Sequence, residues 1–293
     1  MGKRIMHFCT AVLLIAGLGL LLYPLVSNLY YEWVQNQMTA SYDQLVTEQM
    51  PQQQRNLQLE ECRNYNDNLR EGGVLLTDPF DEAQLDPSSM PYAGLLNLMG
   101  DGSMGYLEIP AIDVNLVIYH GVQEEVLSKG VGHLQGSSLP VGGTGTHCVL
   151  SAHTGLNNKK LFTDLDQLVE GDVFYLHVLD EVLAYQVDQI KVVLPHETSD
   201  LSINAEQDYV TLVTCTPYGI NSHRLLVRGV RIPYEEAQQV QQVQQTQQRS
   251  STWQQQYLLA MVAGIAGVAL VIVVVMVVKA AARALKRRAE SHR

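Results

Sequence analysis

Three patterns of apolar and polar positions follow one another along this chain of 293 residues. Residues 5–26 contain no Asp, Glu, Lys or Arg, and residues 257–278 form a second uncharged run. Each run is long enough for a membrane-spanning helix of about 20 residues. Between them, short apolar and β-branched runs alternate with turn-forming residues, which is typical of strands. The pattern therefore predicts two membrane helices that flank a β-rich middle part.

Basic residues lie at both extremes of the chain. Lys3 and Arg4 precede the first uncharged run, and the second is followed by Lys279, Arg283, Lys286, Arg287 and Arg288. Because positive charge is retained on the cytoplasmic side of a membrane, we expect a two-pass protein of the cell membrane with its middle part outside. A cleaved signal peptide is the alternative for the first run, but the stretch "YPLVSNLYY" contains no small-x-small cleavage site.

The middle part is predicted to form a closed β-barrel of about eight mostly antiparallel strands with short helices. The strand-like runs cover residues 105–109, 114–119, 147–152, 173–177, 182–194, 209–214 and 225–232. Polar residues rich in Gln, Glu and Asn precede the barrel and predict one or two helices, with a break near Pro51. Residues 72–103 are rich in Gly, Pro, Asp and Ser and are predicted to form a long loop.

These patterns give seven predicted regions. They are an anchor with a short cytoplasmic tail (1–29), a helical region (30–71), a loop (72–103), a barrel (104–234), a Gln-rich tether (235–256), a second membrane helix (257–278) and a basic tail (279–293). We expect the tether to be solvated or weakly helical, because it has hardly any large apolar residues.

The charge and the cysteines narrow the possible functions. The net charge of −11 includes the basic residues of the tails, so the middle part is acidic. Nucleic acid is therefore not an expected partner. Of four cysteines, Cys9 lies in the first uncharged run, which leaves Cys62, Cys148 and Cys215 outside the membrane. Exported domains usually pair their cysteines, but an odd number leaves at least one thiol free. A Cys62–Cys148 disulfide is possible from the sequence.

The stretch "TLVTCTPYGINSHRLLVRG" (211–229) is predicted to be a hairpin with Cys215 at the end of one strand and Arg224 at the start of the next. If the two strands pair as antiparallel neighbours, these residues lie about 5 Å apart along the backbone. A nucleophilic thiol needs a base, and a guanidinium can donate several hydrogen bonds to a developing negative charge. Arg228, on the same face of the strand, is the nearest rival of Arg224.

A histidine is the usual helper of a catalytic thiol, and the chain has nine. We single out His153 in "CVLSAHTGL", because it follows an apolar strand and precedes a loop that contains glycine. Spacing alone does not separate it from His120 or His147.

The segment "TLVTCTP", with an Arg nine residues after the Cys, resembles the signature of the sortases, the membrane-anchored cysteine transpeptidases of Gram-positive bacteria. "GYLEIPAIDVNLVIYHGVQEEVLSKGVGHLQGSSLPVGGTGTHCVLSAHTGL" and "KLFTDLDQL" also look like class C, pilus-assembling sortases, so the resemblance covers residues 104–232. It implies Cys215 as nucleophile, His153 as general acid/base and Arg224 as stabiliser of the oxyanion or the substrate. It also implies that an LPXTG-like sorting signal is cleaved between Thr and Gly and joined to a lysine amine of a pilin subunit, so that pilin subunits and the membrane are the expected partners.

The long loop contains "TDPFDE", with Asp78, Pro79 and Phe80. Class C sortases carry a lid with an Asp-Pro-aromatic motif, and the resemblance implies that Asp78 pairs with Arg224 and that Phe80 covers Cys215. An ordinary Asp-Pro turn is the alternative, since Asp86 and Pro87 form such a pair as well.

Three alternatives to this function remain open. A thiol hydrolase would use the same nucleophile with water as acceptor, and a cell-wall-anchoring sortase would use it with a different acceptor. A tethered scaffold would keep the cysteine as an inert core residue. We expect no cofactor and no metal, because no His pair has ligand spacing and no Asp-rich calcium loop occurs.

Overall fold

A computed structural model describes residues 2–72, 76–80, 91–156, 158–246, 258–268 and 276. The chain divides into two compact units: one holds Leu22–Gln248, and the other holds Met1–Leu21 with Arg249–Arg293. The first of these contains the barrel and the helices that pack on it. The part of the chain that the structure describes contains no helix both long and apolar enough to cross a membrane. The two predicted flanking spans are therefore not supported. Part of the second span (257, 269–275 and 277–278) lies outside the described residues, as does the basic tail.

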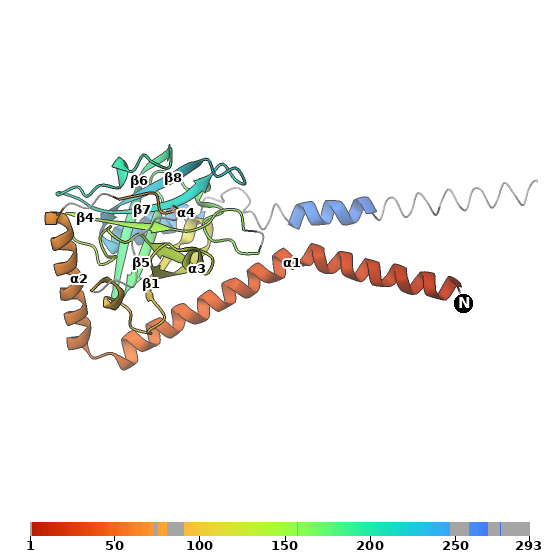
Figure 1. Cartoon of the computed structure of the whole chain (residues 1–293), viewed down its shortest axis with the longest axis horizontal. Coiled ribbons are helices and arrows are strands. Elements are labelled where there is room, and N and C mark those ends of the chain that lie inside the picture. Colours follow the sequence, from red (N-terminus) through yellow and green to blue (C-terminus); the bar gives the residue numbers. More distant parts are fainter. Residues whose placement is uncertain are drawn as a thin grey trace, which may run out of the picture. The chain divides into compact units, whose positions relative to one another are not determined.

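Eight strands form a closed barrel, as the sequence predicted, and their order around it is β1-β2-β3-β4-β7-β8-β6-β5. Figure 1 shows the labelled strands packed together in one body. Their bounds are β1 Ser103–Ile109, β2 Val114–His120, β3 Val131–His133, β4 Thr146–Ser151, β5 Val173–Val178, β6 Glu181–Val193, β7 Asp208–Thr216 and β8 His223–Ile232. Six of the eight pairings are antiparallel, while β2 with β3 and β4 with β7 are parallel. The three-residue β3 was not predicted, because so short a run has no readable alternation.

The interior of the barrel is filled by apolar side chains that alternate with outward-facing residues along the strands. Phe162, Phe174, Leu107, Leu150, Leu212 and Val227 are all fully buried in this core. Gly229 in β8 has a packing reason: a Cβ at this position would lie 2.6 Å from the ring of Phe174. The β8 backbone can therefore approach the core closely.

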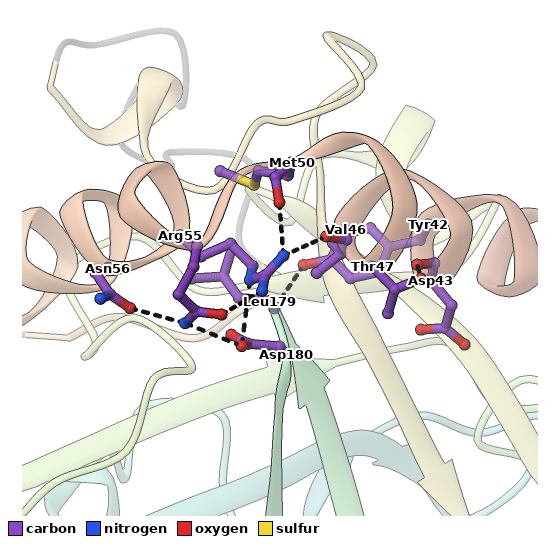
Figure 2. Close-up of polar contacts among 10 residues, drawn as sticks. Tyr42, Asp43, Val46, Thr47, Met50, Arg55, Asn56, Leu179 and Asp180 are labelled. Atoms are coloured by element: carbon purple, nitrogen blue, oxygen red, sulfur yellow. Dashed lines mark hydrogen bonds and ion pairs between the residues drawn. The ribbon is translucent and has the colours of Figure 1, made fainter.

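Two long helices precede the barrel, α1 (Gly2–Gln44) and α2 (Gln52–Gly72), and they meet at the predicted break near Pro51. A π-helical turn (Leu45–Gln49) ends in Met50, whose extended backbone is the conformation favoured before proline. Arg55 fastens this corner to the barrel (Figure 2): Nη1 donates to the carbonyl oxygens of Val46 (2.8 Å) and Met50 (2.6 Å), and Nε lies 3.2 Å from Asp180. The chain therefore enters the long loop after Gly72 from a fixed helix.

Two segments predicted to be loop or tether pack on the barrel. Residues 92–94 form a 3-10 turn (Tyr92–Gly94) in which Tyr92 is buried and contacts His133 through its hydroxyl at 2.9 Å. The first part of the Gln-rich stretch is helix α4 (Tyr234–Thr246), which buries Ala237 against β5 and β6. Residues 247–256 of the predicted tether lie outside the described residues.

Candidate active site

Cys215 and Arg224 lie directly opposite each other on β7 and β8. The antiparallel register runs from Tyr209↔Val230 to Thr216↔His223, so the two residues occupy the last rungs before the loop 217–222. The predicted hairpin is thus confirmed. It places a thiol and a guanidinium at one rim of the barrel.

His153 reaches the same rim through the parallel pairing of β4 with β7. Ser151 is the register partner of Val213, and the amide of Ala152 donates to the Val213 carbonyl at 3.2 Å. The hydroxyl of Thr214 donates to the Ala152 carbonyl at 2.7 Å. Since the strands run in the same direction, the residue two positions after Ser151 and the residue two positions after Val213 emerge at the same end. These residues are His153 and Cys215.

The two rival histidines are enclosed in the core and their ring nitrogens are occupied. In His120, the nitrogens contact the carbonyl oxygens of Gly102 (2.9 Å) and Leu95 (2.8 Å), and burial lowers its pKa. His147 contacts the Ser202 carbonyl (2.9 Å) and the Thr211 hydroxyl (2.7 Å), and burial lowers its pKa to about 4.

Arg224 is held by a carboxylate from the long loop. Its Nε and Nη2 donate to the two oxygens of Asp78 at 2.8 and 2.5 Å, and Nη1 donates to the carbonyl oxygens of Asn221 and His223 at 3.1 Å. Both side chains are 11% exposed. A two-pronged pair of this kind combines charge with fixed geometry. It raises the pKa of Arg224, although burial acts in the opposite direction.

Phe80 lies between the arginine and the histidine of the rim. Its ring centroid is 5.0 Å from Arg224 Cζ and 5.9 Å from the His153 ring centroid. Phe80 also packs on a cluster of buried apolar residues that includes Val213 and Leu226. Asp78, Pro79 and Phe80 therefore form one turn over this end of the barrel, while the other Asp-Pro pair (Asp86 and Pro87) lies outside the described residues.

The thiol of Cys215 is partly buried, and burial raises its pKa. The neighbouring Arg224 charge lowers the pKa of this thiol, whereas the charge of Asp78 raises it. Asp78 therefore opposes thiolate formation both directly and by occupying the guanidinium. With the turn in this position, the thiol is mainly protonated near neutral pH.

Arg228, the rival of Arg224, is engaged in the wall of the barrel. Its Nε and Nη2 contact Asp188 on β6 at 3.1 and 2.8 Å, and its guanidinium carbon lies 4.2 Å from the ring centroid of Tyr209. Cys62 and Cys148 are both free and buried, so the possible disulfide between them does not form. Among the described residues, no three His, Cys, Asp or Glu side chains gather as a metal-ligand group.

A hollow of about 860 Å³ opens beside the turn that carries Asp78. Its walls include Leu76, Val193, Leu201 and Ser202. The first three of these belong to the same apolar cluster as Phe80. The hollow runs along the segment between β6 and β7, and its lining does not include Cys215, His153 or Arg224.

Glu124 is a rim residue that the sequence did not single out. It lies on the short helix α3 (Glu124–Leu127), and its carboxylate is 3.0 Å from Nε2 of His153. No signal in the sequence could have found this contact, because the two residues are 29 positions apart and meet only in the folded barrel.

Residues 107–232 match the sortase domain family. Sortase D of Bacillus subtilis (strain 168) is 30% identical over 131 residues, which cover 44% of this chain and 63% of that protein. The chain thus spans less than two thirds of that relative. A crystal structure of Streptococcus pneumoniae sortase C is 46% identical, with a TM-score of 0.61, and the match covers 68% of this chain and 97% of that one. The pilus-related sortase C of Group B Streptococcus is 43% identical, with a TM-score of 0.62 and coverage of 67% and 98%.

The family match and the closed eight-strand barrel define the class of protein: the sortases, which are cysteine transpeptidases. The chain belongs to the sortase family, and within it to the class C, pilus-related type.

Proposed function

We propose that the chain cleaves an LPXTG-like sorting signal between Thr and Gly and transfers the acyl group to a lysine amine of a pilin subunit, which polymerises pili. The observation that carries this proposal is the register of β7 and β8, with Cys215 directly opposite Arg224 at the rim that His153 also reaches. The relation to pilus-related sortases supports the choice of substrate.

The proposed acylation begins when the Cys215 thiolate attacks the carbonyl carbon of the Thr–Gly bond. The carbonyl oxygen becomes an oxyanion, and the guanidinium of Arg224 donates hydrogen bonds to it. The tetrahedral intermediate collapses as the C–N bond breaks, and His153 gives a proton to the leaving Gly amine. A thioester between Cys215 and the Thr carbonyl remains.

In the second half of the reaction, a lysine amine attacks the thioester carbonyl and passes a proton to His153. The C–S bond breaks, Cys215 leaves as thiolate and an isopeptide bond joins the two subunits. Water has to be outcompeted, so the amine must be held near the thioester by binding. The hollow beside Leu76 and Val193 has room for an extended peptide and is the proposed place for the sorting signal.

The turn with Asp78, Pro79 and Phe80 is proposed to be a lid. Asp78 uses the donors of Arg224 that an oxyanion would need, and it opposes ionisation of Cys215. Both effects end when the turn leaves. The arrangement therefore supports a resting state that must open before substrate can react.

Membrane attachment stays a prediction from the uncharged runs at residues 5–26 and 257–278. Fractionation of cells tests it. Recovery of the protein in the membrane pellet after an alkaline wash is expected, and recovery in the soluble fraction would contradict it.

The experiment that tests the proposed function combines the full-length protein, a pilin with its sorting signal and a pilin domain that offers a lysine. A ladder of cross-linked products is expected, and it should disappear when the acceptor lysine is replaced with Arg. Release of the Gly-containing fragment without a cross-link would identify a thiol hydrolase. Absence of both products, with a Cys215 that resists thiol reagents even after Asp78 and Phe80 are replaced, would indicate a scaffold.

A further inference from the structure

Among the described residues, the side chain of His153 has one polar partner, a carboxylate from another element of the rim. Nε2 lies 3.0 Å from Oε2 of Glu124, within hydrogen-bond distance. The imidazole is 21% exposed and the carboxylate 74% exposed, so the contact lies at the mouth of the site. Phe80 contacts the same imidazole from the lid.

Hydrogen bonds from helix α1 fix the backbone next to the helix that carries Glu124. Directly after α3, the carbonyl oxygen of Lys129 accepts hydrogen bonds from the hydroxyl of Tyr31 (2.8 Å) and the amide of Gln35 (2.9 Å), both on helix α1. Leu127, the last residue of α3, is buried in the apolar cluster below the rim. The carboxylate of Glu124 therefore extends from a rigid support.

The backbone that carries His153 is equally well fixed. The residue before it is bonded to β7 on both sides, and its own carbonyl accepts a hydrogen bond from the amide of Phe162 at 3.1 Å. With the backbone fixed, the imidazole can still rotate about its side-chain torsions. A partner at Nε2 limits this rotation.

We infer that Glu124 is a positioning residue for His153: it orients the imidazole and selects the form that carries a proton on Nε2. A carboxylate only accepts hydrogen bonds, so Nε2 must donate to it. In the neutral ring the other nitrogen, Nδ1, is then the proton acceptor. This inference rests on the proposed function, in which His153 gives and receives the protons of the acyl transfer.

The size of the effect follows from the exposure of Glu124. General acid–base catalysis contributes about 10²–10⁴-fold to a rate, and an exposed carboxylate controls only a small share of it. We therefore expect Glu124→Gln and Glu124→Ala to lower kcat about 3- to 10-fold with little change in KM. Because an exposed charge is screened by salt, the difference between wild type and Glu124→Gln should shrink as the salt concentration rises.

Glu125 offers a matched control. It is the neighbouring exposed acid on α3, and Glu125→Gln removes the same charge from the same helix without removing the hydrogen bond to His153. We expect Glu125→Gln to keep the wild-type kcat and salt dependence.

A second readout does not depend on turnover. In full-length protein with ¹⁵N-labelled histidine, the His153 signals are assigned by their loss in His153→Gln. They should show the neutral ring protonated on Nε2 in wild type and in Glu125→Gln, and a mixture of the two neutral forms in Glu124→Ala. Unchanged His153 signals and an unchanged kcat in Glu124→Ala would overturn the inference. So would a higher kcat, since Glu124 would then restrain the histidine rather than position it.

Failure of the proposed function and failure of the positioning role of Glu124 would give different results. If the wild type makes no cross-link with the pilins, the proposed function fails, while the ¹⁵N signals still test the contact. If wild-type protein makes the ladder and the Glu124 variants match it in rate and in His153 signals, only the positioning role is lost.

Discussion

Strand β8 carries two arginines on one face, and each forms a two-pronged pair with an aspartate. Arg228 pairs with Asp188, which lies on the adjacent strand β6 next to a register shift between Val187 and Gln189. Arg224 pairs with Asp78, which comes from a turn outside the barrel, 146 positions away in sequence. The chemistry of the two pairs is the same, but their attachment differs.

The attachment decides what each pair can do. Asp188 lies in β6 between Val187 and Gln189, which are both paired with β8, so its backbone cannot move away from Arg228 without breaking strand pairing. Asp78 sits on a turn that contacts the rim through Phe80 and can leave without breaking any strand pairing. We therefore expect the pair in the wall to contribute to stability, and we propose that the pair at the rim regulates access to Cys215.

The largest expected difference between the pairs concerns turnover. Arg224→Lys keeps the charge but loses the planar set of donors, and loss of one oriented donor to an oxyanion costs about 100-fold in rate. Arg228→Lys should retain a near-normal rate, because Arg228 faces Asp188 and Tyr209 in the wall. Peptide cleavage by the two folded variants measures this. Similar rates for both variants would show that Arg224 and Arg228 do not differ in their contribution to turnover.

A smaller effect is expected when the lid is loosened. The lid is held by an ion pair whose side chains are 11% exposed and by the contact of Phe80 with Arg224. If these contacts favour the closed state by roughly 1–2 kcal/mol, about 3–15% of molecules are open. Replacing Asp78 and Phe80 together with Ala should raise the rate of Cys215 alkylation about 5- to 30-fold.

The control for the lid is Asp188→Ala, which breaks the corresponding pair in the wall and should leave alkylation unchanged. Cleavage of an LPXTG-type peptide should rise with alkylation in the lid variant. Equal alkylation rates in wild type and in the lid variant would mean that the Asp78 turn does not control access to Cys215.

The pH dependence of alkylation should move in opposite directions for the two partners at the rim. The charge of Asp78 raises the pKa of Cys215, so Asp78→Asn should shift the rise in alkylation to lower pH. The charge of Arg224 lowers the same pKa, so Arg224→Gln should shift the rise to higher pH. Rate profiles over pH, scaled to their plateaus, separate this shift from the overall rate. The absence of a shift in both variants would show that burial alone controls the pKa of the thiol.

The smallest expected effect concerns stability. Side chains of the Arg228–Asp188 pair are 20% and 28% exposed, so Asp188→Ala should cost about 1 kcal/mol in free energy of unfolding. For a unit of this size, that corresponds to a melting temperature about 2–4 °C lower. Thermal unfolding of Asp78→Ala provides the comparison, and a larger loss there than in Asp188→Ala would contradict the assignment of the stabilising role to the wall.

Much of the barrel could be predicted from the sequence, because its longer strands have apolar, β-branched runs bounded by turn residues. The pairing of Cys215 with Arg224 could be predicted as well, since one short loop connects their strands. The parallel pairing of β4 with β7 has no local signal, because 56 residues separate Ser151 from Asp208. That pairing brings His153 to the rim, which is why spacing alone did not separate it from His120 and His147.

The contacts that depend on the folded barrel were not predictable in the same way. Tyr92 anchors the end of the long loop through His133, although its surroundings in sequence are those of a loop. Glu124 lies in a short polar helix whose place beside His153 depends on α1. In each case the partner is distant in the sequence, and no periodicity connects the two residues.

The proposed function requires Cys215 to form a thioester with the sorting signal. The most direct test is the intact mass of the full-length protein after brief incubation with an LPXTG-type peptide and no amine acceptor. We expect a mass increase equal to the acyl group that ends at the Thr of the peptide, located on Cys215, reversed by hydroxylamine and absent in Cys215→Ala. An adduct on another residue, or ladder formation by a folded Cys215→Ala protein, would contradict it.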